Sequence, residues 1–67
     1  MLKITIFLKG YTEPISLKCD DYEASHYDST INLDLYYLEG KEKDDESVGA
    51  FAQFVDVAGY FAKKITE

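Results

Sequence analysis

The stretch that decides the fold is SVGAFAQFVDVAGYFAKKI, residues 47–65. Its apolar residues recur at intervals of three and four, which is typical of an amphipathic helix. A helical wheel places the following residues on one face: Val48, Phe51, Phe54, Val55, Ala58, Phe61, Ala62 and Ile65. Acids precede the stretch and lysines end it, as the helix dipole favours. We therefore predict a C-terminal amphipathic helix over about residues 45–65.

The alternative for the same stretch is a pair of strands around residues 54–58. Gly49 and Gly59 lie inside the predicted helix, and each costs about 1 kcal/mol there relative to alanine. Gln53 favours the helix, because alternation would place it on the same face as Phe51 and Val55.

Upstream, the apolar residues alternate, which is typical of half-buried strands. Strands are predicted at about residues 2–9, 14–20 and 29–38, and the connection of four or five residues that begins at Gly10 favours a hairpin between the first two. Residues 20–28 show no period and are predicted as an acidic loop. The positions predicted to face the core are Leu2, Ile4, Ile6, Leu8, Ile15, Leu17, Cys19, Ile31, Leu33, Leu35 and Tyr37.

These elements predict a single α+β domain over residues 1–67, in which the helix covers one face of a three-stranded antiparallel sheet. The third strand could pair with either the first or the second. In a meander, the acidic loops 20–28 and 39–46 lie at opposite ends of the sheet, about 25 Å apart. The other face of the sheet is open.

Composition narrows the class of protein. A single cysteine excludes an internal disulfide and favours the cytoplasm, and no apolar run reaches the length of about 18 residues that spans a membrane. The chain has thirteen acidic residues, seven lysines and no arginine, for a net charge of −6. This balance argues against direct binding of nucleic acid and of anionic membranes.

Catalytic chemistry is not indicated. Cys19 lies in the inward phase of its strand, and His26 lies in the acidic loop, so a catalytic pair is disfavoured. The acids around His26 lack the spacing and the glycine of a calcium loop, and zinc would need more Cys or His ligands. We predict no enzymatic activity, no metal and no cofactor.

The clustered acids are the first candidate for a functional surface. The predicted contacts with a partner protein are Glu39, Glu42, Asp44, Asp45 and Glu46, followed by Asp20, Asp21, Glu23 and Asp28. Clustered carboxylates can take the place of phosphates on a basic surface, and opposite fields speed association. The hypothesis is a small acidic inhibitor that occupies the nucleic-acid-binding surface of another protein.

The opening MLKITIFLKG, residues 1–10, with a second strand at once and an aromatic-rich end, resembles small accessory proteins of phages and other mobile elements of Gram-positive bacteria. This group includes anti-CRISPR and other anti-defence inhibitors. The resemblance implies a genetic context, in which many such proteins bind and disable host machinery. The partner expected for the acidic inhibitor is another protein in the cytoplasm, such as a nucleic-acid-processing host enzyme.

The second candidate surface is the open face of the predicted sheet. Its candidate residues are Lys3, Thr5, Phe7, Lys18 and Tyr36. Lysines among aromatic rings suit a nucleotide-like anion. This alternative predicts a homo-oligomer, at least a dimer, that encloses a small ligand between sheet faces.

Overall fold

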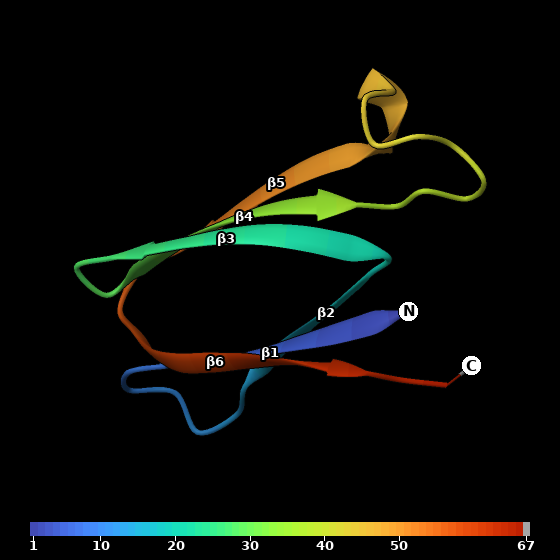
Figure 1. Ribbon diagram of the computed structural model, residues 1–67. Coiled ribbons are helices and arrows are strands. Elements are labelled where there is room, and N and C mark those ends of the chain that lie inside the picture. The colour runs from blue at the N-terminus through green and yellow to red at the C-terminus, as the bar shows by residue number, and fades with distance from the viewer. Residues whose placement is uncertain (67) are drawn as a thin grey trace.

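The computed structural model describes residues 1–66 and consists of two three-stranded antiparallel sheets that face each other (Figure 1). The elements are β1 (Leu2–Leu8), β2 (Ile15–Cys19), β3 (Asp21–Tyr27), β4 (Thr30–Tyr36), the 3₁₀ turn η1 (Glu46–Val48), β5 (Gly49–Phe54) and β6 (Val57–Lys64). Sheet A has the order β2-β1-β6 and sheet B the order β3-β4-β5. Nothing in residues 1–66 forms a helix long and apolar enough to cross a bilayer.

The predicted α+β class is wrong, because residues 45–65 form no helix that covers a sheet. Most of this stretch forms β5 and β6, which belong to different sheets. Strand β5 pairs with the edge of β4 that β3 leaves open, and β6 pairs with the edge of β1 that β2 leaves open. The turn between them contains Asp56 at φ 56° and is fixed by a backbone bond from Lys9 N–H to Asp56 C=O of 2.8 Å.

The predicted loop 20–28 is also wrong, because Asp21–Tyr27 forms β3 and pairs along its whole length with β4. Asp28 and Ser29, at φ 48° and 63°, form the turn of this hairpin. Residues 23–27 of β3 are exposed. A strand exposed on both faces needs no alternation of apolar and polar residues, which explains why the sequence shows none.

The strands predicted at about 2–9, 14–20 and 29–38 correspond to β1, β2 and β4. The side chains that are fully buried between the two sheets are Ile4, Ile6, Cys19, Ile31 and Leu33. Tyr37 was predicted in the core but lies beyond β4 with 38% of its surface exposed. Strand β4 pairs with β3 and β5, so neither predicted partner of the third strand is correct.

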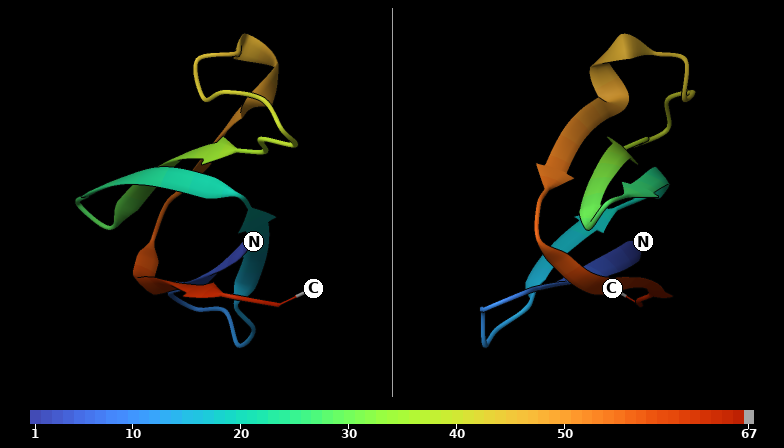
Figure 2. Two further views of the ribbon diagram at one scale, coloured as in Figure 1. Left: turned by 45° about the vertical axis from the view of Figure 1, so that its right-hand side comes forward. Right: turned by 90° about the vertical axis from the view of Figure 1, so that its left-hand side faces the viewer.

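The loop of residues 37–48, which includes η1, rises above one end of sheet B (Figure 2). It begins beside the short connection between β2 and β3. A backbone bond from Asp20 N–H to Tyr36 C=O, 2.8 Å long, holds that connection against the end of β4. This arrangement places the acidic residues of the loop beside the start of β3.

Candidate functional site

The fold separates the charges of the chain into two halves. Residues 20–54, which form sheet B and its long loop, carry ten acidic residues and two lysines, a net charge of −8. Residues 1–19 carry one acidic residue and three lysines, and residues 57–66 carry two lysines and no acid. These two segments form sheet A with its hairpin loop. An acidic layer therefore lies against a basic one.

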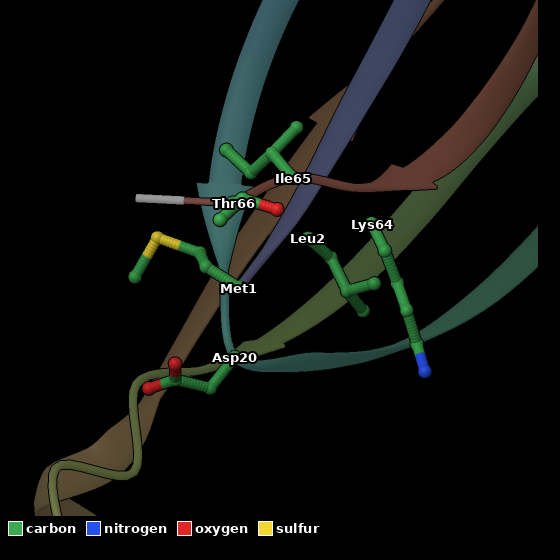
Figure 3. Close-up of a pocket in the computed structure, with 6 residues that line it drawn as sticks. All are labelled: Met1, Leu2, Asp20, Lys64, Ile65 and Thr66. Atoms are coloured by element: carbon green, nitrogen blue, oxygen red, sulfur yellow. The ribbon is translucent and has the colours of Figure 1, made fainter.

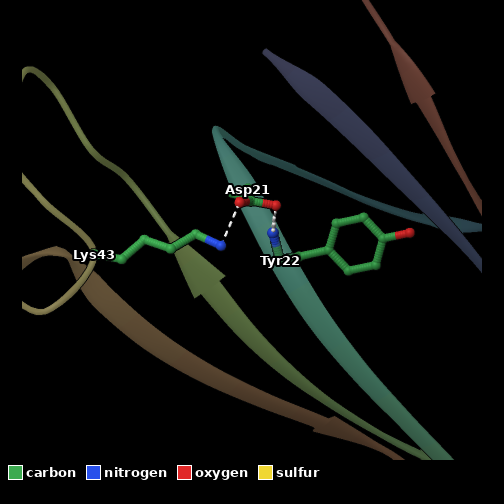
Figure 4. A network of polar contacts seen from close by, with 3 residues as sticks. All are labelled: Asp21, Tyr22 and Lys43. Carbon is green, nitrogen blue, oxygen red and sulfur yellow. Dashed lines mark hydrogen bonds and ion pairs between the residues drawn. The ribbon is translucent and has the colours of Figure 1, made fainter.

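The long loop packs beside the start of β3, so the predicted separation of about 25 Å between the acidic loops is wrong. Asp20 Oδ2 accepts a hydrogen bond of 2.8 Å from the backbone N–H of Leu38. The next carboxylate, Asp21, pairs with Lys43 of the loop and accepts a bond from the backbone N–H of Tyr22 (Figure 4). These bonds join both predicted clusters at one end of sheet B.

The Asp21–Lys43 pair shifts both groups toward their charged forms. The hydrogen bond from Lys43 holds the pKa of Asp21 below its ordinary value, and the same bond raises the pKa of Lys43. The Lys43 ammonium also lies 5.1 Å from the centre of the Tyr36 ring. Partial desolvation, followed by the fields of Glu23 and Asp34, raises the pKa of the Tyr36 hydroxyl.

The outer face of sheet B carries a pair of like charges in register. Glu23 on β3 lies directly opposite Asp34 on β4, and both side chains are exposed. Like charges directly opposite each other destabilise a sheet, and a cation bound from outside would relieve the repulsion. Asp34 was missed as a candidate contact because its place beside Glu23 depends on β3, which the sequence does not reveal.

The loop carries five exposed carboxylates, and hydrogen bonds hold one of them, Asp45, in place. Asp45 Oδ1 accepts bonds from the backbone N–H of Ser47 at 2.9 Å and from its hydroxyl at 2.7 Å, and these bonds lower the pKa of Asp45. Lys41 Nζ donates to the same hydroxyl at 3.0 Å. The other exposed carboxylates of the loop are Glu39, Glu42, Asp44 and Glu46.

We define the acidic surface by the residues that lie on this end and outer face of sheet B: Asp20, Asp21, Glu23, Asp34, Glu39, Glu42, Asp44, Asp45 and Glu46. Asp28 does not belong to it. It lies in the β3–β4 turn, at the opposite end of the hairpin. The structure thus brings together eight of the nine predicted acidic contacts.

The predicted sheet-face site falls mostly on the outer face of sheet A. Lys3, Thr5, Phe7 and Lys18 share this face, whereas Tyr36 lies on sheet B and is not part of it. The register aligns Lys3 with Lys18 on one side and with Lys63 on the other.

An aromatic pair adjoins this row of lysines. The ring centres of Phe7 and Phe61 lie 6.0 Å apart with a tilt of 31°, and both residues are exposed. Lys63 and Phe61 were not identified as candidates, because a helix over residues 45–65 would have kept them off the sheet. The face carries no carboxylate from β1, β2 or β6.

Cys19 and His26, the two candidates for nucleophile and base, lie on different strands, β2 and β3. Cys19 is fully buried, and the loss of solvent around its thiol is the main reason that the pKa of the thiol is raised. His26 lies on the exposed edge strand, with its ring edge-on to Tyr60 at 5.9 Å. No group of three or more His, Cys, Asp or Glu residues within residues 1–66 could hold a metal ion.

The hollow near the chain ends has a volume of about 420 Å³ (Figure 3). Its lining residues are Met1, Leu2, Asp20, Lys64, Ile65 and Thr66. Asp20 is already engaged with Leu38, and Lys64 is exposed to solvent. The side chains of Asp20 and Lys64 point away from each other in Figure 3.

Comparison with known proteins adds no assignment: no family model, curated protein or solved structure gives a significant match. Two surfaces of opposite sign remain, and backbone N–H groups hold three carboxylates of the acidic one in place.

Proposed function

We propose that this protein is a non-enzymatic interaction module whose acidic surface binds a basic, nucleic-acid-binding surface of another protein. The observation that carries the proposal is the joining of the two acidic clusters on one layer with a net charge of −8. Such a concentration of like charge attracts a basic partner over a distance and accelerates association.

The acidic surface is also ordered before a partner arrives. Asp20, Asp21 and Asp45 each accept a hydrogen bond from a backbone N–H. A partner that meets fixed carboxylates loses less conformational entropy than one that must order a flexible loop. Glu23 and Asp34 repel each other in the free protein. A cationic side chain of the partner would remove this repulsion and so favour the bound state.

The resemblance of residues 1–10 to phage accessory proteins supports a specific version of this proposal. In that version the partner is a host enzyme that processes nucleic acid, and the protein acts in the cytoplasm as an anti-CRISPR or other anti-defence inhibitor. Its carboxylates take the positions of phosphates in the groove of the enzyme, so protein and nucleic acid compete.

The test compares two triple variants that change the net charge equally. The first, Glu39→Gln/Glu42→Gln/Glu46→Gln, removes three charges from the acidic surface. The matched control, Glu13→Gln/Asp28→Asn/Asp56→Asn, removes three charges outside it. Both are compared with the wild-type protein as baits in bacterial lysate at low salt, and the captured proteins are identified by mass spectrometry.

The deciding measurement is displacement of a labelled nucleic acid from the captured protein, followed by fluorescence anisotropy. The wild type and the control should displace it, and the first variant should be weaker by about tenfold, since exposed ion pairs contribute roughly 0.2–1 kcal/mol each. Binding without displacement, or equal potency of the two variants at low salt, contradicts the proposal.

A second candidate function follows from the outer face of sheet A. Lys3 lies opposite Lys63, and these like charges would be relieved by an anion. The Phe7–Phe61 pair beside them offers an apolar surface for a nucleotide base. We propose a nucleotide-like anion as the ligand of this face, bound in a homo-oligomer.

Calorimetric titration with ATP as the probe tests this second candidate. Lys3→Gln/Lys63→Gln should lower the affinity, whereas Lys9→Gln/Lys64→Gln removes two charges elsewhere and should leave it unchanged. Absence of heat at millimolar ATP, or an equal loss in both variants, contradicts it.

A further inference from the structure

The edge strand β5 differs from the other three edges of the molecule. Natural sheets protect their edges with charged residues, proline or bulges, because an open edge pairs with other strands. Here β2 carries Lys18, β3 carries Asp21 and Glu23, and β6 carries two lysines, but β5 carries no charge and no proline. The uncharged stretch extends beyond the strand at both ends, since nine uncharged residues, 47–55, separate Glu46 from Asp56.

The outer backbone groups of β5 can be assigned from the register. Tyr37 N–H donates to Val48 C=O at 2.9 Å, which makes these two a hydrogen-bonded pair at the end of the β4–β5 ladder. Because such pairs alternate along an antiparallel ladder, the groups of Gly49, Phe51 and Gln53 point away from β4. Across residues 1–66, no backbone bond between elements uses these outward groups.

The side chains along this edge leave apolar surface in solvent. Phe51 exposes 65% of its surface on the outer face of sheet B, and Val55 exposes 60% just beyond the strand. Strand β5 is one of the two edge strands of sheet B, as Figure 1 and the right-hand view of Figure 2 show. It presents donors, acceptors and an aromatic ring together.

We propose that β5 pairs antiparallel with β5 of a second copy of this chain, which joins the two B sheets into one six-stranded sheet. A second copy fits because antiparallel pairing of a strand with itself sets identical residues near one another. If β3 or β6 paired with its own copy, like charges would lie near one another. Pairing of β5 with its own copy brings no charges together.

The register follows from the outward groups. Centring the pair on Phe51 aligns Gly49 with Gln53 of the second copy, so all the outward groups of Gly49–Phe54 are paired. The two Phe51 rings then meet across the two-fold axis, and the missing side chain of glycine leaves room for glutamine. Each copy has one such edge, so the assembly closes as a dimer.

The two-fold axis runs perpendicular to the sheet, so both acidic surfaces lie on the same face of the dimer. Asp34 and its symmetry mate are three strand spacings apart, about 14 Å. This exceeds the screening length of about 8 Å at physiological ionic strength. The repulsion between the two copies, each with a net charge of −6, is therefore felt at low salt and largely screened at physiological salt. Added salt should strengthen the dimer, whereas it weakens binding of a basic partner. This opposite dependence separates failure of the dimer from failure of the proposed function.

The first test is sedimentation velocity of the full chain from 10 µM to 1 mM, at low and at high salt. The wild type should show a monomer–dimer equilibrium that shifts toward dimer with salt. Phe51→Lys places two lysines opposite each other at the centre and should weaken the dimer at least tenfold. The control Tyr27→Lys alters an exposed aromatic residue of β3, at the opposite edge of sheet B, and should dimerise as the wild type does.

The second test is amide hydrogen exchange at both ends of this concentration range. The N–H of Phe51 should exchange fast in the monomer and slowly in the dimer, while that of Ala52, which points to β4, stays protected throughout. A wild type that remains monomeric at 1 mM and high salt overturns the proposal. So do assemblies larger than a dimer, or an association that Tyr27→Lys abolishes and Phe51→Lys does not.

Discussion

Leu33→Ala provides the sharpest test of the fold. Leu33 lies in the middle of β4, the central strand of sheet B, with 0% of its surface exposed. Truncation of a fully buried leucine costs about 2–5 kcal/mol, because the cavity that it leaves does not close. A chain of 67 residues has a free energy of unfolding of only about 3–10 kcal/mol, so this single change removes a large fraction of it.

The assay is thermal and urea unfolding followed by circular dichroism, with dilute protein. For a domain of this size each kcal/mol lowers the melting temperature by about 4–8 °C, so Leu33→Ala should lower it by about 10 °C or more, or abolish the cooperative transition. Phe54→Ala should cost less than Leu33→Ala, because Phe54 is only half-buried, and Val55→Ala, at a position 60% exposed, should change little. A cooperative melt of Leu33→Ala within about 3 °C of the wild type would refute the reasoning.

Three further outcomes are expected. A thiol reagent should modify Cys19 only as fast as the protein opens, because burial keeps the thiol protonated and inaccessible; fast labelling of the folded protein would contradict this. Carbon-detected NMR titration should place the pKa of Asp45 below its ordinary value of 3.8, and Ser47→Ala should return it toward that value. Because the folded pKa is depressed, the loop contact of Asp45 should be fully present above about pH 4 and lost as the pH falls through the folded pKa. Ser29→Gly should raise the free energy of unfolding by about 1 kcal/mol, since Ser29 holds a φ of 63° in the β3–β4 turn; an unchanged urea midpoint would show that the turn is unstrained.

The strands with one buried face could be predicted from the sequence, and the others could not. In β4, Ile31, Leu33 and Leu35 alternate with polar residues because one face packs on the core and the other meets solvent. Strand β3 is exposed on both faces over most of its length, so burial leaves no pattern in its sequence. The stretch 47–65 fits a helical stripe as well as two strands, and local spacing cannot distinguish them.

The candidate site shows the same division. The sequence alone determined the excess of acidic residues, the absence of arginine, and the position of most carboxylates within residues 20–54. It could not show that Asp21 meets Lys43, that Glu23 faces Asp34, or that Lys63 joins Lys3 on sheet A. Each of these neighbours depends on strand pairing between distant segments.

The amino-acid sequence by itself determined which residues of β1, β2 and β4 turn inward, because side-chain direction in a strand is a local property with a period of two. Only the tertiary structure decided that residues 49–64 are strands. The open edges of β1 and β4 supply hydrogen-bond partners to this stretch, whereas Gly49 and Gly59 weaken a helix there. The same pairing separates the acidic layer from the basic one and leaves β5 as the uncharged edge.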